Sequence, residues 1–549
     1  MSASSKKKLR SEEAAAKMTE KQLAEQKEAK KLKIYSIIFS IIIAAMLVVT
    51  LWTVGSKAIN TSGIIERNTV AMTVGEEKIS SAEMNLYYIS AINEFMNQYG
   101  AYASMFGLDT TKPLNEQMAD EESGTTWADD FLNSAKESVK ATYAMVAEAK
   151  ANGYTLSEEE MHSIDHSIED VTNQAVSSGY GDLKTFLKAM YGPGCNEKLF
   201  RHYLETSTLA QSYYTHYSNS LTYEDADLRE AEKENFNEYS SFTYNSYILN
   251  ASKFLTGGTT DEEGNTTYTD EEKAASVKAA EDAAKALTAD EIVTVEDLDA
   301  AIAGLEINAE AENAASSAYV DNAYGSVTAS IREWISDSSR KEGDKTYIAN
   351  TTTSTDAEGK EVTTTTGYTV VMYKSTNDNT FALANVRHIL VSFEGGTTGE
   401  NGSVTYSDEE KAAAKTKAEE LLAAWNAGEA TEESFAALAT ENTTDPGSKE
   451  NGGLYEDVYP GQMVVNFNDW CFDEARKAGD TGIVETNYGY HVMYYVGDSE
   501  TNYRDFMLTN DLRNADTEEF YNQVVEAATV TDGDFSKIPM DLVLGGAQY

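Results

Sequence analysis

One long apolar run lies near the start of this chain. After it, hydrophobic residues recur first at mainly helical spacing and later also in strand-like runs. Residues 34–54 contain no charged side chain, and a helix of that length, at about 1.5 Å per residue, crosses roughly 30 Å of hydrocarbon. Tyr35 and Trp52 lie near its two ends, where interfacial aromatic residues are common. The run predicts a transmembrane anchor. A cleaved signal peptide is the alternative, with the small residues Ser56 and Ala58, on either side of Lys57, as its cleavage site.

From residue 60 to residue 240 the apolar positions recur mainly at helical spacing, after a short strand-like pair at 70–79. This region is also rich in Tyr and Met. Those side chains either pack the helices together or form an adaptable apolar surface for unfolded chains, because Met and aromatic side chains suit promiscuous binding. The pattern predicts a mainly α-helical domain over 60–240.

A long internal repeat follows the helical region. Residues 257–275 match residues 395–413, from a Gly-Gly-Thr-Thr start to an Asp-Glu-Glu-Lys-Ala-Ala helix opening. Downstream, a Gly-Tyr pair at 367–368 and another at 489–490 each open a strand-like run. A repeat of this size predicts two copies of one α/β domain rather than a solenoid.

Residues 499–549 contain one amphipathic helical pattern, at about 503–528, and then a polar tail. Alone, this helix would expose its apolar face. We therefore expect it to pack on another domain.

Charge limits the class of partner. The net charge is −48 and the pI is about 4.4, so a nucleic-acid partner is excluded for lack of side chains to neutralise phosphates. Residues 1–33 are the exception, with ten Lys and Arg against five Glu. By the positive-inside rule they form a cytoplasmic tail, and the chain after the anchor is extracytoplasmic. Cys195 and Cys471, the two cysteines, indicate no disulfide framework.

Candidate chemistry lies in the second copy. His388 and His491 stand near its two ends, each inside an apolar, strand-like run, and Asp445 opens an Asp-Pro-Gly-Ser loop between them. Adjacent strands can bring distant histidines within hydrogen-bond reach, where each tunes the protonation of the other. Each residue also has a purely structural interpretation, as a core histidine or as a turn aspartate.

The first copy lacks these residues. Thr369 stands where the second copy has His491, and Tyr247, or a near neighbour, stands where it has His388. The Asp-Pro-Gly-Ser loop is also missing. We expect this copy to keep the fold and lose the site.

The motifs of the second copy resemble the parvulin-type peptidyl-prolyl isomerase domain, and the whole layout resembles extracytoplasmic foldases of the PrsA and SurA class. The resemblance implies that His388 and His491 form a hydrogen-bonded pair at the floor of a catalytic site, with Asp445 above it. It also implies a proline pocket lined by Leu454, Met463 and Phe467. After the paired glycines at 452–453 the family usually has Asp, whereas this chain has Leu454.

The resemblance also implies an α+β multidomain fold, in which each parvulin-like domain has a four-stranded antiparallel sheet with helices and the C-terminal helix packs on the helical domain. The expected parts are a basic cytoplasmic tail (1–33), a transmembrane anchor (34–54), a helical chaperone domain (60–240), a degenerate parvulin-like domain (238–377), a parvulin domain (381–498), and a C-terminal helix and tail (499–549).

The implied function is a membrane-anchored, extracytoplasmic peptidyl-prolyl cis/trans isomerase and chaperone that assists the folding of exported proteins. Lowering the barrier of roughly 18–20 kcal/mol to peptide-bond rotation requires no nucleophile, metal or cofactor, so none is expected. The alternative is a non-catalytic chaperone or surface scaffold that holds exported unfolded chains. The expected partners are unfolded polypeptides with X-Pro bonds and, through the anchor, the membrane; monomer and dimer both remain open.

Two further observations narrow this hypothesis. The loop at 394–410, after the first strand of the second copy, contains no Lys or Arg, so plain X-Pro is a better substrate than a phosphorylated one. His162 and His166 have a spacing that can bind a metal, but no third ligand is in view, and a solvated helix face is the favoured interpretation.

Overall fold

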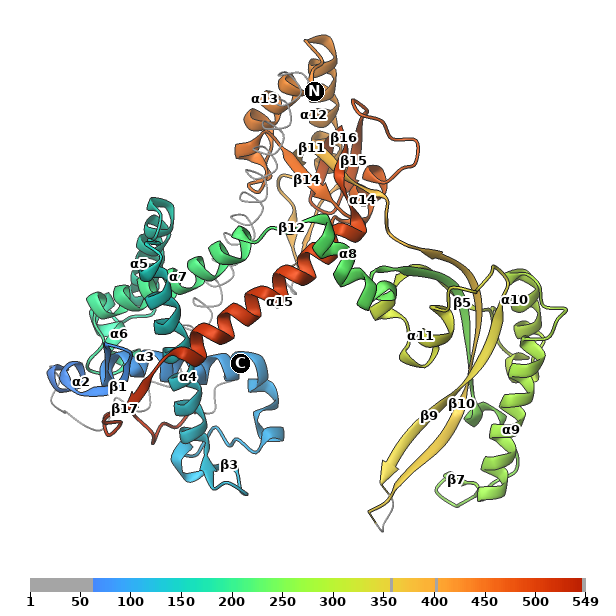
Figure 1. Ribbon diagram of the computed structural model, residues 1–549, viewed down its shortest axis with the longest axis horizontal. Coiled ribbons are helices and arrows are strands. Elements are labelled where there is room, and N and C mark those ends of the chain that lie inside the picture. The colour runs from blue at the N-terminus through green and yellow to red at the C-terminus, as the bar shows by residue number, and fades with distance from the viewer. Residues whose placement is uncertain (1–62, 356–358, 400–402, 546–549) are drawn as a thin grey trace. The chain divides into compact units, whose positions relative to one another are not determined.

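The computed structural model describes residues 63–355, 359–399 and 403–545, which form a multidomain chain of mixed α and β structure (Figure 1). They divide into two compact units: the described parts of Met1–Thr222 and Leu512–Tyr549 form the first unit, and Tyr223–Asp511 forms the second. The predicted tail at 1–33 and anchor at 34–54 lie outside the described residues. Of the helices in the described ranges, none combines the length and the apolar character that a membrane span requires.

The first unit is mainly helical. Its longer helices begin at side-chain caps that the sequence supplies: Thr126 and Asp129 form a capping box at the start of one helix, and Ser157 and Glu160 form another. The helices and short 3-10 turns of this unit are α2 (Ile64–Asn68), α3 (Ser81–Tyr99), η1 (Gly100–Phe106), η2 (Leu114–Glu116), α4 (Trp127–Ala151), α5 (Glu158–Ser177), α6 (Leu183–Tyr191) and α7 (Glu197–Ser220).

The first unit is also discontinuous in sequence. Residues near the end of the chain complete its small sheet, in which β17 (Val530–Asp532) pairs with β1 (Val70–Val74), and β1 pairs with β2 (Glu77–Ser80). Ile538 and Leu544 are buried in the same core as the α3 and α4 side chains. The sequence predicted only a polar tail here; the prediction missed this order because the apolar residues of the tail are few and need the helical region to cover them. A separate hairpin joins β3 (Met118–Asp120) to β4 (Thr125–Thr126).

Helix α15 (Tyr503–Ala527) contains the boundary between the units, at Asp511 and Leu512. In the first unit its aromatic residues pack on α7: the Phe520 ring stacks on Tyr217 with centroids 3.6 Å apart, and Tyr521 meets Tyr214 edge-on. This part of α15 is therefore a component of the helical core.

The second unit contains two four-stranded antiparallel sheets with the same topology. In each, numbering strands along the chain, the spatial order is second, first, fourth, third. The first sheet is β8 (Ser317–Ala323), β5 (Ser241–Asn250), β10 (Glu361–Asn377) and β9 (Lys345–Thr355). The second sheet is β14 (Leu454–Val458), β11 (Ala382–Ser392), β16 (Gly489–Asn502) and β15 (Thr481–Thr486).

Helices and short hairpins surround both sheets. The helices are α8 (Asp225–Glu234), α9 (Asp270–Leu287), α10 (Val295–Ala303), α11 (Ala329–Ile335), α12 (Asp408–Ala427), α13 (Glu432–Asn442) and α14 (Val465–Cys471). The 3-10 turns are η3 (Phe236–Tyr239), η4 (Ala251–Phe254), η5 (Glu306–Asn308), η6 (Tyr324–Ser326) and η7 (Lys449–Asn451). The hairpins are β6 (Thr259–Thr260) with β7 (Thr266–Thr267), and β12 (Thr397–Thr398) with β13 (Val404–Thr405).

The two faces of the second sheet carry different cores, because alternate residues of a strand point to opposite sides. On one face Ile389 and Val492 pack against α12 and α13 through Trp425 and Phe435. On the other face Val386 and Met493 pack against α14 through Phe467 and Cys471. The histidines belong to this second face, which sets where the site lies.

The internal repeat extends further than the sequence analysis recognised. Helices α11 and α14 each place a Trp under an Arg: Arg340 lies 4.6 Å from the ring centroid of Trp334, and Arg476 lies 3.9 Å from that of Trp470. Low identity between the two helices hid this part of the repeat.

The copies differ most in the hairpin between their last two strands. In the second sheet β15 and β16 are joined by Asn487 and Tyr488 alone. In the first sheet, β9 and β10 run on together beyond Asn350 and Gly367, the pair that corresponds to Thr486 and Gly489 (Figure 1).

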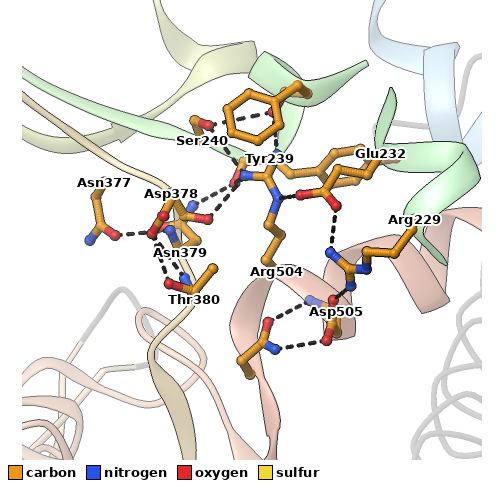
Figure 2. A network of polar contacts seen from close by, with 12 residues as sticks. Arg229, Glu232, Tyr239, Ser240, Asn377, Asp378, Asn379, Thr380, Arg504 and Asp505 are labelled. Atoms are coloured by element: carbon orange, nitrogen blue, oxygen red, sulfur yellow. Dashed lines mark hydrogen bonds and ion pairs between the residues drawn. The ribbon is translucent and has the colours of Figure 1, made fainter. Parts of the chain in front are cut away.

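A buried arginine joins three segments of the second unit (Figure 2). The guanidinium of Arg504, at the start of α15, donates to Glu232 on α8, to main-chain oxygens of Phe236 and Tyr239, and to that of Asp378 in the segment between the sheets. Its side chain is 1% exposed, and these acceptors compensate the buried charge.

Candidate active site

The two histidines meet across the central strands of the second sheet. His388 lies on β11 and His491 on β16, where they are diagonal neighbours: His388 pairs with Met493, and His491 pairs with Leu390. Both side chains are buried, and their Nδ1 atoms are 3.0 Å apart. The sheet register therefore makes a hydrogen-bonded pair from residues that are distant in sequence.

Asp445 lies over this pair, in the loop that follows α13. Thr443 and Thr444 fasten the loop to β11, because Leu390 N donates to Thr443 Oγ1 and Thr444 N donates to Leu390 O. The Asp445 carboxylate is 3.0 Å from His388 Nε2. A predicted turn residue is thus also a direct partner of the histidine.

The main chain of His388 is held close to the main chain of Gly453. His388 N donates to Gly453 O at 2.8 Å, and Gly453 adopts φ 75°. A Cβ at Gly453 would lie 2.2 Å from His388 O, so only glycine fits here. Arg387 holds the same loop by donating to the carbonyl oxygens of Asn451 and Gly452.

The hydrogen bonds of the site form one connected chain. A carboxylate only accepts hydrogen bonds, so His388 Nε2 carries the proton that it shares with Asp445. When both rings are neutral, His388 Nδ1 must then accept from His491 Nδ1. His491 Nε2 in turn accepts from the Thr486 hydroxyl, which is 2.9 Å away. The chain from Thr486 to Asp445 therefore fixes the tautomer of each ring.

Burial and hydrogen bonding shift the ionisation of the site in a consistent direction. Burial alone would raise the pKa of Asp445, but hydrogen bonds from His388 and Ser448, the charge of His388 and the Tyr455 hydroxyl hold that pKa well below its usual range. Burial, and next the proximity of His388, lower the pKa of His491 to about 3. Burial and the Asp445 charge raise the pKa of Tyr455 well above its usual value. At neutral pH the site therefore holds a carboxylate above a neutral His491.

Apolar side chains flank the pair. The Phe467 ring meets His388 and His491 edge-on, with centroids 5.4 Å and 5.3 Å away, and Met463 packs on the same cluster. Of the three residues expected to line a proline pocket, Phe467 lies beside the histidines, and Met463 packs on the cluster that contains Phe467. Apolar side chains therefore lie next to the polar groups of the site.

Leu454 is not part of this arrangement. It pairs with Arg387, whose side chain contacts Glu432 on α13, so Leu454 faces the α12 and α13 side of the sheet. The next residue, Tyr455, stacks on His388 with centroids 5.2 Å apart. Tyr455 rather than Leu454 therefore faces the histidines, because consecutive strand residues point to opposite faces of a sheet.

The sequence analysis missed three polar residues of the site. The Ser448 hydroxyl donates to Asp445 Oδ2 at 2.5 Å and lies 3.0 Å from His388 Nε2, and the Tyr455 hydroxyl donates to Asp445 at 2.9 Å. Thr486 bonds His491 as described above. Ser448 belongs to the Asp-Pro-Gly-Ser loop, which was a usable signal, whereas Tyr455 and Thr486 become recognisable only from the register.

The corresponding positions of the first sheet carry different chemistry. Thr369 pairs with Ile248, as His491 pairs with Leu390, which places Ser246 at the position of His388. Ser246 is a near neighbour of Tyr247, which the sequence analysis allowed for. The four-residue turn η4, present in the first copy, shifts the offset between the repeats. Thr369 Oγ1 donates to Asn350 there, at 2.9 Å.

The other histidine pair lies on α5 in the first unit. The Nε2 atoms of His162 and His166 are 3.0 Å apart. In the described residues no group of three His, Cys, Asp or Glu side chains is arranged to hold a metal ion.

Acidification is expected to destabilise the second sheet through His491. Its folded-state pKa of about 3 lies below the unfolded value of about 6.5, so between these values the unfolded state binds more protons and stability falls with falling pH. The slope approaches about 1.4 kcal/mol per pH unit. Hydrogen exchange of β16 amides between about pH 7 and 5, corrected for intrinsic rates, measures it. The β10 amides around Thr369 are the internal control, and an equal slope there would contradict the assignment.

Comparisons with known proteins agree with this geometry. Residues 370–498 match the sequence model of the PPIC-type PPIase domain. The chain is 38% identical over 68 residues to the foldase protein PrsA 1 of Listeria innocua and 33% identical over 105 residues to the foldase protein PrsA of Caldanaerobacter subterraneus. These matches cover 12% and 18% of this chain, and 23% and 34% of the respective relatives.

Among solved structures, the peptidylprolyl isomerase PrsA from Bacillus cereus matches with 27% identity, a TM-score of 0.18, and coverage of 27% of this chain and 49% of that chain. The chain thus spans about a quarter to a third of the length of the curated relatives named above. It carries a PPIC-type, or parvulin-type, peptidyl-prolyl isomerase domain and is similar over part of its length to the PrsA foldases.

Proposed function

We propose that the chain is a membrane-anchored, extracytoplasmic peptidyl-prolyl cis/trans isomerase that also holds unfolded exported polypeptides. The observation that carries the catalytic part is the His388–His491 pair, with Asp445 bonded to it and Phe467 beside it, inside the segment that matches the isomerase family. The anchor and its orientation rest on the uncharged run at 34–54 and the basic residues before it.

The site residues fit a reaction that makes and breaks no covalent bond. Phe467 and Met463 would hold the proline ring, while the carbonyl before it turns through the twisted state in which amide resonance is lost. Asp445 and the histidines are held by fixed hydrogen bonds, so they need no reorganisation during that rotation. Groups preorganised in this way stabilise a transition state more than the ground state.

The first sheet supports a division of labour. Ser246, Thr369 and Asn350 stand where the second sheet has His388, His491 and Thr486. We therefore assign isomerisation to the second copy and treat the first as a degenerate parvulin-like domain.

The substrate class follows from charge. In the described parts of the loop after β11, the acidic side chains include Glu410, whose carboxylate accepts from Gly396 N and Ser407 N at the start of α12. No Lys or Arg occurs between residues 394 and 410. A phosphorylated residue before proline would be repelled here, which favours unmodified X-Pro bonds in newly exported chains.

The test is cis/trans exchange of a short Ser-Pro peptide measured by NMR with the full chain. We expect acceleration over the uncatalysed exchange, which takes tens to hundreds of seconds, and a smaller acceleration for the phosphoserine form. The matched control is the His388→Ala/His491→Ala double variant, which should no longer accelerate the exchange of the Ser-Pro peptide. No acceleration by the folded wild type would remove the enzyme and leave a non-catalytic chaperone or scaffold.

A further inference from the structure

The long hairpin of the first sheet is a feature that isomerisation does not use. The described residues 351–355 and 359–366 occupy the place of Asn487 and Tyr488 in the second sheet. They extend β9 and β10 as a two-stranded ribbon rich in threonine, in which the hydroxyls of Thr353 and Thr363 lie 3.3 Å apart across the strands. Within the described residues 351–355, each side chain is exposed.

Strand β9 also forms the edge of its sheet, with β10 as its neighbour there. It is eleven residues long, against six for the corresponding edge strand β15. An edge strand presents a row of main-chain N–H and C=O groups that can pair with another chain. Strand β9 therefore exposes a longer row of main-chain groups for such pairing than β15 does.

The other three edge strands of the two four-stranded sheets carry features that discourage pairing. Strand β8 has Asp321 with φ 44° at a register shift, and β14 has Asp457 with φ 53° at another. Strand β15 contains Glu485. Charges and bulges of this kind are how edge strands avoid pairing with other chains.

Strand β9 lacks these features over most of its length. Residues 346–355 contain no charged side chain and no proline, and no residue of β9 has a positive φ. The irregularity in this hairpin falls between Thr365 and Gly367, on β10. The outer edge of β9 is therefore neutral and regular over ten residues, in a chain of net charge −48.

We propose that the outer edge of β9 binds an extended segment of an unfolded client polypeptide as an added antiparallel or parallel strand. Main-chain hydrogen bonds would supply the affinity. The short threonine side chains offer no deep pockets, so the edge would accept many sequences. This inference rests on the proposed chaperone function and locates one binding surface for it, outside the isomerase site.

Charge favours a client over a second copy of the chain. Two copies would bring together two bodies of −48 each, whose repulsion opposes association. An unfolded segment of ordinary composition carries no such penalty, and the neutral ribbon does not repel it.

The test uses the full chain and a neutral, proline-free peptide of about ten residues that alternates Thr and Val, matched to the strand length. Hydrogen exchange should slow at amides of residues 346–355 when the peptide binds. A second peptide with alternate amides N-methylated keeps the side chains but loses main-chain donors, and it should bind about tenfold more weakly or worse.

Two variants locate the surface. One replaces residues 351–366 with Asn-Tyr, the loop of the second sheet, and the other is Thr352→Lys/Ser354→Lys, which keeps the hairpin length. Both should weaken peptide binding about tenfold or more while leaving X-Pro exchange unchanged. The matched control is Thr416→Lys on α12, which should change neither.

Several results would overturn the proposal. Equal binding of the N-methylated peptide, unchanged peptide binding by both variants, or no peptide binding at all would each do so. Protection of β9 that rises with protein concentration without peptide would also do so, because it would mean that a second copy of the chain occupies the edge. Because the probe contains no proline, failure of the isomerase claim appears separately, as absent catalysis alongside intact β9 binding.

Discussion

Replacing Asp445 with Asn is expected to lower kcat/KM for X-Pro isomerisation by about 10- to 100-fold. The Asp445 carboxylate accepts from Ser448, Tyr455, His388 and Gly447 N. An amide of the same shape has one acceptor oxygen. If that oxygen takes the place of Oδ2, where the three side-chain partners converge, the NH₂ group faces the Gly447 N–H donor at the place of Oδ1. An unsatisfied buried polar group costs about 1–3 kcal/mol, which corresponds to the stated range of rates if it falls on the transition state.

The rate is measured by NMR exchange on the same unphosphorylated peptide, at saturating and subsaturating concentrations. The matched control is Asp473→Asn, a half-exposed carboxylate on the same domain that pairs with Arg476 away from the histidines. Its rate should match the wild type. A full rate in Asp445→Asn, with the fold intact by NMR, would show that the carboxylate is only a turn residue.

Replacing Arg504 with Ala is expected to cost about 3–5 kcal/mol of stability where its three segments meet. Its side chain is buried, carries a full charge, and donates to Glu232 and to the carbonyl oxygens of Phe236, Tyr239 and Asp378. Removing one partner of a buried ion pair leaves the other groups unsatisfied, at a cost of this size. The cation also lies 4.0 Å from the centroid of the Phe236 ring.

Hydrogen exchange at amides of residues 236–241 and 377–381 measures the local opening free energy. The matched control is Lys233→Ala, since Lys233 pairs with Glu230 on an exposed face of α8, where a change of about 0.5 kcal/mol or less is expected. Arg504→Lys should keep the positive charge but lose most hydrogen bonds to the main-chain oxygens, because an ammonium group lacks the planar, forked donors of a guanidinium. Equal effects of Arg504→Ala and Lys233→Ala would refute the assigned role.

The sequence was most informative where spacing and residue type both carry meaning. Two histidines in apolar runs and an Asp-Pro-Gly-Ser loop predicted a cluster, and the structure brings His388, Asp445 and His491 together. The repeat predicted two related α/β parts, and the structure has two sheets of one topology. The site motifs and the repeat are local sequence patterns, so a single sequence is enough to recognise them.

The sequence did not reveal which face of a strand each residue takes, nor the contacts between segments distant in sequence. Whether Leu454 or Tyr455 faces His388 is a question of a single residue of register, and side chains of consecutive strand residues point to opposite faces. Register also decides which residue of the first copy stands at the position of His388: it is Ser246, next to Tyr247. Arg504 gave no signal, because its acceptors are main-chain oxygens from segments distant in sequence.

The discontinuity of the first unit constrains the order in which the chain can fold as it emerges. Strand β1 finds its partner β17 only after more than four hundred intervening residues, and Ile538 and Leu544 enter the core later still. Each sheet of the second unit, by contrast, is assembled from one continuous stretch of chain, and loop closure is less costly over shorter separations. During vectorial emergence the two sheets can therefore form while the helical unit remains unfinished, with its apolar surface exposed until the final strand arrives.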